Sequence, residues 1–340
     1  MQAMRYVVLG ATGSVGRVLL RLLADRLCVS PEQVVALAST KGAEVSMGED
    51  AILKVQRAAD FCFQKNDLVF SAVRASLAEE IIPKALKAGA RVIDKSAAFR
   101  QTAPLVVPEV NADLLEVAEG ESPQLIASPN CVVIPLVVAT HPLAMAFGLK
   151  RLVVATYQAV SGAGKKGLDT LYAETKKVLM ADAPSLEGSP FPKQIAFNVL
   201  PQIGPLGADG VSDEEDKIQK ETQKILSACL QQHRPTGDAS FEITATAVRV
   251  PTFMSHGIAV VMETEEAFEL REVEALLQDA QGVVLRHDHL FTPMDASSED
   301  SVFITRLRQT GPRTLAFWVV CDNLLKGAAL NAIQIAEALR

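Results

Sequence analysis

The chain has 340 residues, of which 49% are hydrophobic, 5% aromatic and 21% charged. At about 150 residues per domain, this length predicts two domains, each with ample core. The 33 basic and 40 acidic residues give a net charge of −7, which argues against nucleic acid and anionic membranes as partners.

Cysteines and apolar runs indicate the compartment. The five cysteines are scattered and odd in number, which favours a reducing, cytoplasmic compartment over a disulfide framework. The first apolar run, residues 6–9, is too short for a signal peptide. Prolines and polar residues interrupt the most apolar stretch, residues 125–149, so no membrane span is expected.

The first third of the chain alternates short apolar runs with segments of helical spacing. Buried strands are predicted over residues 6–9, 34–37, 67–72 and 91–94. Helices are predicted over residues 17–27 and 77–88. This alternation is typical of a parallel, doubly wound α/β sheet with helices on both faces.

After residue 131 the pattern changes to longer strands. The predicted strands cover residues 151–160, 241–250, 257–264 and 314–320, and the predicted helices cover residues 132–147, 166–180 and 322–339. Ser212 followed by Glu215 has the spacing of a capping box, so a further long helix should begin there. These elements predict a second, α+β domain.

A glycine-rich turn joins the first predicted strand to the first predicted helix. Its candidate binding residues are Gly10, Thr12, Gly13, Ser14, Val15 and Gly16. Such a turn lets the backbone approach a pyrophosphate, and the helix N-terminus supplies N–H donors. It predicts a Rossmann-type dinucleotide-binding domain, although the spacing is not G-x-G-x-x-G and an ordinary turn is the alternative. We assign this domain to residues 1–130, completed by the C-terminal helix 322–340, and the second domain to residues 131–321.

The end of the second predicted strand indicates which dinucleotide is bound. An NAD site usually has an acidic residue here for the ribose 2′-hydroxyl. This sequence has Ser39 and Lys41 instead, which suit a 2′-phosphate and favour NADP, with NAD left open. The alternative for Lys41 is a solvated loop lysine.

Cys131 is the one cysteine predicted at the N-terminus of a helix. The helix dipole lowers the pKa of a thiol in that position and makes it a better nucleophile. Core packing is the alternative. The other cysteines lie in apolar runs and are predicted as core: Cys28, Cys62, Cys229 and Cys321.

Two arginines and a histidine lie near predicted strand ends. His256 lies in a turn between two strands and could be a general base, while Arg249 could hold a carboxylate through two hydrogen bonds. Arg100 follows a strand at the edge where open α/β sheets bind ligands. A turn histidine, a strand-end arginine and a surface arginine are the respective alternatives.

Two further charged clusters are weak signals. Glu214 and Lys217 lie three residues apart on a predicted helix, which is an ordinary surface pair. His287 and His289 flank Asp288 but have no third ligand nearby, so no metal site is expected.

Taken together, these segments resemble the aspartate-semialdehyde dehydrogenase family over nearly the whole chain. The motifs that carry the resemblance stand in the family's order, at residues 10–16, 94–100, 104–111, 129–131, 158–165, 198–202, 214–226, 249–256 and 322–337. The resemblance implies a Rossmann-type domain, a second catalytic and dimerisation domain, a homodimer and a role in amino-acid biosynthesis. The implied reaction is a reversible, phosphate-dependent, NADP-linked conversion of an amino-acid semialdehyde to an acyl phosphate.

The resemblance also implies roles for residues at matching positions. Cys131 resembles the nucleophile that forms a thioester, His256 the acid/base, and Gln158 the residue that orients substrate at the cysteine. The implied binding residues are Arg249 and Glu214 for the substrate carboxylate and amine, Arg100, Asn130 and Lys217 for phosphate, and Asn323 and Gly327 for the nicotinamide.

Several positions beside the implied site depart from the family pattern. The family has a glycine before the histidine and a serine after it, whereas this chain has Ser255 and Gly257. Val132 and Val133 replace serine and threonine after the cysteine. Such a set resembles the Usg-type paralogues, so a non-catalytic paralogue that keeps the fold and dimer is the alternative. The retained cysteine and histidine favour an enzyme.

Overall fold

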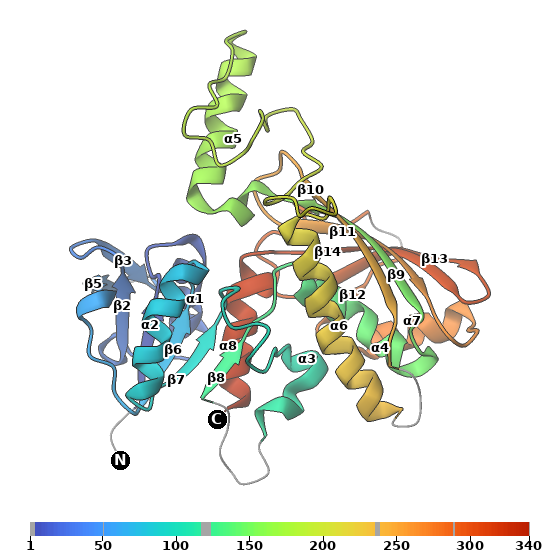
Figure 1. Ribbon diagram of the computed structural model, residues 1–340, viewed down its shortest axis with the longest axis horizontal. Helices are drawn as coiled ribbons and strands as arrows, with labels where there is room; N and C mark the ends of the chain where they lie inside the picture. Colours follow the sequence, from blue (N-terminus) through green and yellow to red (C-terminus); the bar gives the residue numbers. More distant parts are fainter. Residues whose placement is uncertain (1–3, 50, 117–123, 235–238, 288–289, 340) are drawn as a thin grey trace. The chain divides into compact units, whose positions relative to one another are not determined.

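The computed structural model describes residues 4–49, 51–116, 124–234, 239–287 and 290–339 (Figure 1). The chain divides into two compact units. The first comprises Met1–Asn130 and Ala328–Arg340, and the second comprises Cys131–Gly327. Each unit has a six-stranded sheet of its own.

The first unit is built on a parallel sheet in the order β5-β2-β1-β6-β7-β8. Its strands are β1 (Arg5–Leu9), β2 (Val34–Ala38), β5 (Gln56–Arg57), β6 (Asp67–Ser71), β7 (Arg91–Asp94) and β8 (Leu125–Ala127). Strands are added first on one side of β1 and then on the other, which confirms the predicted doubly wound sheet.

Helices cover both faces of this sheet. Tyr6 and Val8 of β1 share a core with α1 (Ser14–Asp25) and with α8 (Leu330–Ala338) at the end of the chain. The alternate side chains of β1 share a core with α2 (Ala75–Lys87) on the other face. Because apolar residues point to both faces, β1 is a continuous apolar run, as is typical of a central parallel strand.

Several short elements of the first unit were not predicted, β5 and β8 of the sheet among them. β3 (Glu44–Met47) and β4 (Ala51–Lys54) form a separate antiparallel hairpin, and α3 (Pro108–Asn111) is a single helical turn. Val45 and Met47 bury their side chains in the core of α1, whereas the alternate residues of β3 are exposed. Segments of four residues are too short to give a reliable periodic signal.

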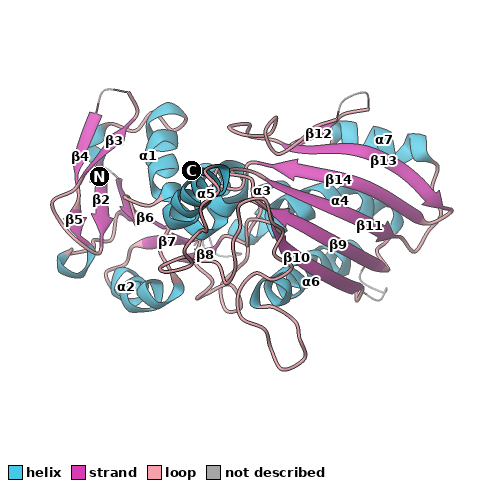
Figure 2. Ribbon diagram, turned by 90° about the horizontal axis from the view of Figure 1, so that it is seen from above, coloured by secondary structure: helices cyan, strands magenta, loops and turns pink. Residues whose placement is uncertain are grey.

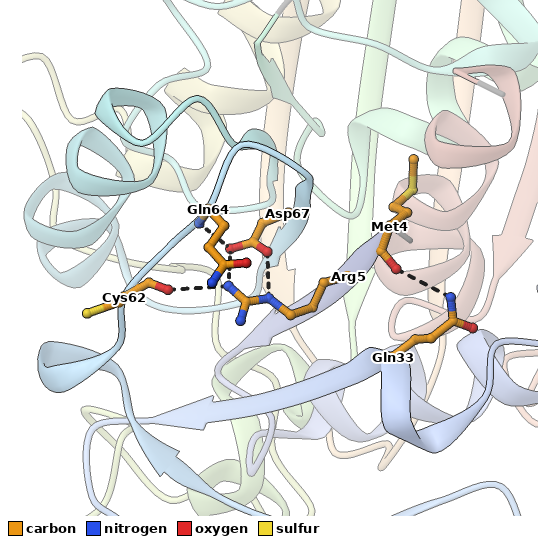
Figure 3. A network of polar contacts seen from close by, with 6 residues as sticks. All are labelled: Met4, Arg5, Gln33, Cys62, Gln64 and Asp67. Atoms are coloured by element: carbon orange, nitrogen blue, oxygen red, sulfur yellow. Dashed lines mark hydrogen bonds and ion pairs between the residues drawn. The ribbon is translucent and has the colours of Figure 1, made fainter. Parts of the chain in front are cut away.

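A polar network ties the start of β1 to β6 (Figure 3). Arg5 donates from Nε and Nη2 to the two carboxylate oxygens of Asp67, at 2.6 and 2.8 Å. Asp67 is buried and also accepts from the backbone N–H of Gln64. The hydrogen bond to Asp67 raises the pKa of Arg5. Because Arg5 and Asp67 are register partners, this ion pair secures the end of the sheet opposite the carboxyl ends of its strands.

The second unit contains a mixed sheet in the order β10-β9-β11-β14-β13-β12 (Figure 2). Its strands are β9 (Arg151–Gln158), β10 (Glu242–Arg249), β11 (His256–Glu263), β12 (Val283–Leu285), β13 (Val302–Gly311) and β14 (Thr314–Cys321). β9 and β10 are parallel, as are β12 and β13, and the other neighbours are antiparallel. The unit has the α+β character that the longer strands predicted.

Helices α4 (Val133–Phe147), α6 (Asp213–His233) and α7 (Leu270–Asp279) pack on this sheet. The predicted capping box of α6 is confirmed, because Ser212 Oγ accepts from the Glu215 N–H and the Glu215 carboxylate accepts from the Ser212 N–H. The remaining long helix, α5 (Gly164–Leu179), packs on residues 191–200 in a small core of its own. Among the helices that the structure describes, none is long and apolar enough to cross a membrane.

The predicted C-terminal helix over residues 322–339 is only partly correct. Asp322 is buried, and its carboxylate accepts from the backbone N–H groups two and three residues later and from Ser298. A π-helical turn (Leu325–Ala329) follows, and α8 begins only at residue 330. Residues 322–327 therefore belong to the second unit and not, as predicted, to the dinucleotide-binding one.

Candidate active site

Polar side chains form one cross-strand row at an end of the second sheet. Gln158 ends β9, Arg249 ends β10 and His256 begins β11. Gln158 is the register partner of both other residues, and all three are buried. Register partners in neighbouring strands lie roughly 5 Å apart. Strand pairing therefore brings together side chains that are far apart in the sequence.

Cys131 and His256 are in contact. Cys131 lies two residues before the start of α4, and its Sγ is 3.5 Å from His256 Nε2. His256 is 1% exposed, whereas Cys131 is only partly buried and can be reached by a substrate. A thiol at a helix N-terminus and in contact with an imidazole has the setting of a cysteine nucleophile.

The other cysteines do not share this setting. Cys229 and Cys321 are buried as predicted, and burial raises the pKa of the Cys321 thiol. The prediction that Cys28 and Cys62 lie in the core is wrong, because both are exposed in loops. The residues on either side of Cys28, Leu27 and Val29, are the ones buried in the core.

The second ring nitrogen of His256 is held by the backbone. The Ala159 N–H donates to His256 Nδ1 at 3.0 Å, and the Ala159 carbonyl accepts from Arg249 Nη1 at 2.7 Å. Ala159 thus links the histidine to the arginine. The sequence did not single it out, because a backbone donor and acceptor carry no signal of residue type.

Arg249 is a buried cation, 7% exposed. Burial lowers its pKa, while the charges of Glu214 and Cys131 act in the opposite direction. Its bond to Ala159 uses one of the five N–H donors of the guanidinium. Gly162 makes room for it, since a Cβ there would lie 2.8 Å from Nη1. A buried guanidinium of this kind can hold a carboxylate through two hydrogen bonds.

Gln158 is engaged at both ends of its amide. Its Nε2 donates to Glu214 Oε1 at 3.0 Å, and its Oε1 accepts from Thr156 at 3.3 Å. Gln158 therefore positions Glu214 at the start of α6. Lys217, one turn further along α6, forms an ion pair with Asp213 and remains partly exposed.

Asn323 and Gly327 lie in the same unit as Cys131. Asn323 Oδ1 accepts from Ser161 Oγ at 3.0 Å and from the Ser255 N–H at 2.9 Å, which fixes the orientation of the amide. Gly327 approaches the backbone of Cys131 so closely that a Cβ would lie 2.9 Å from the Cys131 carbonyl oxygen.

In the first unit the glycine-rich turn leads into α1 as predicted. A Cβ at Gly10, where φ is +92°, would lie 2.6 Å from the carbonyl oxygen of Ala72, and one at Gly16 would lie 2.1 Å from that of Gly10. Gly13 is the N-cap residue of α1 and makes no side-chain cap. At these glycines the turn presents backbone atoms and no side chains. The first N–H groups of α1 are therefore left to bind an anion.

Ser39 and Lys41 follow β2 and are exposed. Arg57, at the end of β5, is the register partner of Ala38 and is 3.7 Å from Asp60. Lys41, Arg57 and a further lysine line a cavity of about 560 Å³. The sequence did not indicate Arg57, because a strand of two residues has no periodic pattern.

Arg100 and Asn130 also belong to the first unit. Arg100 is 6% exposed, and its Nη2 donates to the Lys95 carbonyl at 2.7 Å, so it is not the surface arginine considered as the alternative. Asn130 is buried and directly precedes Cys131.

In the parts of the chain that the structure describes, no group of three His, Cys, Asp or Glu side chains could hold a metal ion. Asp288 and His289 lie outside those parts.

A doubly wound sheet with a glycine-rich turn, and a separate unit in which a thiol meets an imidazole, fit a nicotinamide-dependent dehydrogenase with a cysteine at its active site. Comparison with known proteins supports this class of enzyme. The model of the semialdehyde dehydrogenase NAD binding domain matches residues 5–118, and that of the semialdehyde dehydrogenase dimerisation domain matches residues 140–326. The chain belongs to the semialdehyde dehydrogenase family, and it is a nicotinamide-dependent oxidoreductase.

Similar proteins match over the full length. The aspartate-semialdehyde dehydrogenase of Rickettsia conorii is 42% identical, over 98% of this chain and 96% of that protein. That of Aquifex aeolicus is 37% identical, over 98% and 97%. The structure of aspartate semialdehyde dehydrogenase II from Vibrio cholerae has a TM-score of 0.90 at 35% identity, over 99% of this chain and 98% of that one. These matches confirm the predicted family and fold class, and they do not favour a non-catalytic paralogue.

Proposed function

We propose that the protein interconverts aspartate semialdehyde and the corresponding acyl phosphate, with NADP as hydride carrier and inorganic phosphate as co-substrate. The contact of 3.5 Å between Cys131 Sγ and His256 Nε2 carries the proposal, because it places a nucleophile beside a proton-bearing ring. The substrate is supported by the relatives, which are named aspartate-semialdehyde dehydrogenases, and by the Vibrio cholerae enzyme, which is described as complexed with ASA.

The chemistry follows from the needs of hydride transfer. A hydride leaves an sp³ carbon that bears an oxyanion far more readily than it leaves an aldehyde carbon. Attack by the Cys131 thiolate on the carbonyl makes such a carbon, because the new S–C bond moves the π electrons to oxygen. The nicotinamide, when bound, supplies the hydride acceptor, and a thioester remains on Cys131. Phosphate then attacks the thioester carbonyl, and the C–S bond breaks to release the acyl phosphate and the thiolate.

The cross-strand row and α6 supply the residues that bind the substrate. Arg249 holds the substrate carboxylate with the donors that Ala159 does not use. Glu214, positioned by Gln158, binds the substrate amine. Arg100, Asn130 and Lys217 are the candidates for binding phosphate.

The residues of the first unit fit a dinucleotide. The glycine-rich turn from Gly10 to Gly16, with Thr12 and Ser14, would hold the pyrophosphate at the N-terminus of α1. Ser39, Lys41 and Arg57 would hold a 2′-phosphate, which favours NADP over NAD. In the second unit, Asn323 and Gly327 are the candidates for binding the nicotinamide.

A second copy of the chain is the proposed partner. The family match in the second unit is to a dimerisation domain. One face of its sheet exposes apolar side chains: Tyr157 is 38% and Val261 41% exposed, and Trp318 lies beside Tyr157 with ring centres 5.3 Å apart. Covering this face would bury apolar surface, and two-fold dimers are the commonest soluble oligomers. The five free cysteines fit a reducing compartment, so we place the homodimer in the cytoplasm.

An assay with aspartate semialdehyde and NADP tests the function. Reduction of NADP should require phosphate and should be abolished in Cys131→Ser, because a serine hydroxyl has no strong base to activate it. Cys62→Ser, at an exposed cysteine of the first unit, is the matched control and should retain activity. Activity in Cys131→Ser, or equal rates with and without phosphate, would overturn the proposal.

A further inference from the structure

We propose that Thr156 is a positioning residue for substrate binding. Its hydroxyl holds the Gln158 amide in the orientation that directs Nε2 at Glu214, so that the Glu214 carboxylate stays in place for the ammonium group of the substrate. The inference deepens the proposed function and rests on it for the identity of the substrate.

Thr156 is a polar residue in an apolar setting. Side chains alternate along a strand, so four buried side chains point to the same face of β9: Leu152, Val154, Thr156 and Gln158. A valine has almost the same shape as Thr156 and would pack there without a polar group, whereas a buried hydroxyl is unfavourable unless it forms a hydrogen bond. The hydroxyl of Thr156 therefore needs a partner.

That partner is the amide of Gln158, two residues further along β9. Thr156 Oγ1 donates to Gln158 Oε1 at 3.3 Å, and Gln158 Nε2 donates to Glu214 Oε1 at 3.0 Å. The terminal torsion of a glutamine side chain has no sharply preferred angle, so it is these two bonds that orient the amide. With its oxygen engaged by Thr156, the amide presents its N–H groups to Glu214.

A second contact fixes the backbone that carries Glu214. Glu215 Oε1 accepts from the backbone N–H of Ala247 at 2.9 Å, and Ala247 is the register partner of Thr156 on β10. The start of α6 is thereby fastened to the sheet beside Thr156. Because the backbone is held there, the remaining freedom of Glu214 is in its side chain, and the bond from Gln158 determines where its carboxylate points.

The direction of the Glu214 carboxylate is important because Arg249 is nearby. Burial lowers the pKa of Arg249, and the negative charge of Glu214 acts against that effect, so the two charges interact. A Glu214 side chain released by Gln158 would be drawn to the Arg249 guanidinium, because opposite charges attract more strongly away from water. It would then occupy donors that the substrate carboxylate needs and would leave the substrate ammonium group without its partner.

Loss of the Thr156 hydroxyl should release the amide. In Thr156→Val, the Gln158 Oε1 would be a buried acceptor that has lost its donor, which favours movement of the side chain toward another donor. A half-turn of the amide would set Oε1 against the Glu214 carboxylate. Either motion breaks the hydrogen bond from Gln158 Nε2 to Glu214.

Crystal structures of the apo-protein test the positioning directly. In Thr156→Val we expect the distance from Gln158 Nε2 to Glu214 Oε1 to exceed about 3.5 Å, the limit of a hydrogen bond, and the carboxylate to lie closer to Arg249. Thr156→Ser keeps a hydroxyl and should retain both hydrogen bonds. Unchanged Gln158 and Glu214 side chains in Thr156→Val would overturn the inference. Failure of the unsubstituted protein to reduce NADP would instead refute the proposed function and leave this measurement unaffected.

Steady-state kinetics test the role in substrate binding. Thr156→Val should raise KM for aspartate semialdehyde by about three- to tenfold, the effect of one typical hydrogen bond, and should change kcat by less than about twofold. Thr156→Ser should behave like the unsubstituted protein. Thr264→Val is the control, because Thr264 is equally buried and donates to backbone carbonyls just past the end of β11 opposite His256. Equal rises in KM in Thr156→Val and Thr264→Val, equal rises in Thr156→Val and Thr156→Ser, or a loss confined to kcat would overturn the inference.

Discussion

Gly327 lies against the backbone of Cys131, where a Cβ atom would stand 2.9 Å from the Cys131 carbonyl oxygen and 3.3 Å from its Cβ. The π-helical turn that contains Gly327 is therefore packed directly on the segment that carries the nucleophile. In Gly327→Ala, one of the two segments must shift.

We predict that Gly327→Ala slows alkylation of Cys131 by iodoacetamide and lowers kcat by about tenfold or more, because misplacing a reacting group by 1 Å can cost about 100-fold. The site of labelling is read by peptide mass spectrometry. Gly311→Ala is the control, since its Cβ would meet Thr314 only at ordinary contact distances of 3.4 Å or more. Unchanged labelling and kcat in Gly327→Ala would show that the close contact does not position the thiol.

The residues on either side of His256 have a structural explanation. Gly257 lies under the Trp318 ring, where a Cβ would be 2.2 Å from Cζ2. Ser255 has φ +66°, a left-handed conformation that favours glycine. Its buried hydroxyl has no hydrogen-bond partner among the described residues.

Substituting each of these two residues should therefore change the free energy of unfolding in opposite directions. Ser255→Gly should stabilise the protein by about 0.5–1 kcal/mol, and Gly257→Ser should destabilise it by about 1–3 kcal/mol. Denaturant unfolding measures both. The loss in Gly257→Ser should shrink in a Trp318→Leu background, which removes the ring that causes the clash. An equal loss in both backgrounds would mean that Trp318 is not responsible.

The loop after β2 and the end of β5 should select the dinucleotide. Lys41→Ala and Arg57→Ala should each weaken NADP binding by about tenfold, the value of one hydrogen bond to a charged group. Binding of NAD should change little, because NAD lacks the 2′-phosphate. Calorimetry with both cofactors measures this, and Lys87→Ala on α2 serves as the control. Parallel losses for NAD and NADP would place the 2′-phosphate elsewhere.

Arg249 should matter for substrate and not for cofactor. A lysine in its place cannot keep the bond to the Ala159 carbonyl and also form two parallel hydrogen bonds to a carboxylate. Arg249→Lys should therefore raise KM for aspartate semialdehyde by about tenfold or more while the Kd for NADP stays the same. Arg151→Lys, at the exposed start of β9, is the control. Unchanged kinetics in Arg249→Lys would assign the carboxylate to another residue.

The sequence predicted the elements whose pattern is local. The apolar run of β1, the glycine-rich turn and the capping box at Ser212 each depend on a few adjacent residues, and all three were found. Residues 322–339 were predicted as one helix because Leu324, Ala328 and Ala332 recur at helical spacing. The buried carboxylate of Asp322 instead captures the first N–H groups and a π-helical turn follows.

The geometry of the site depends on contacts that are not local. Arg249, Gln158 and His256 meet only because β9 pairs with both β10 and β11. The family resemblance pointed to these side chains, but no sequence pattern shows that Gln158 holds Glu214 or that a backbone N–H restrains His256. Arg57 escaped notice for a related reason: it is placed by a two-residue strand whose pairing with β2 is set by tertiary structure.

The claim that a thioester forms on Cys131 can be tested by one measurement. The protein is mixed with aspartate semialdehyde and NADP in the absence of phosphate, quenched in acid and analysed by peptide mass spectrometry. We predict about one equivalent of NADPH and one acyl group per active site, located on the peptide that contains Cys131, and loss of that acyl group when phosphate is added before the quench. Sustained NADPH formation without phosphate and without an acylated peptide, or acylation of Cys28, Cys62, Cys229 or Cys321 instead, would contradict the claim.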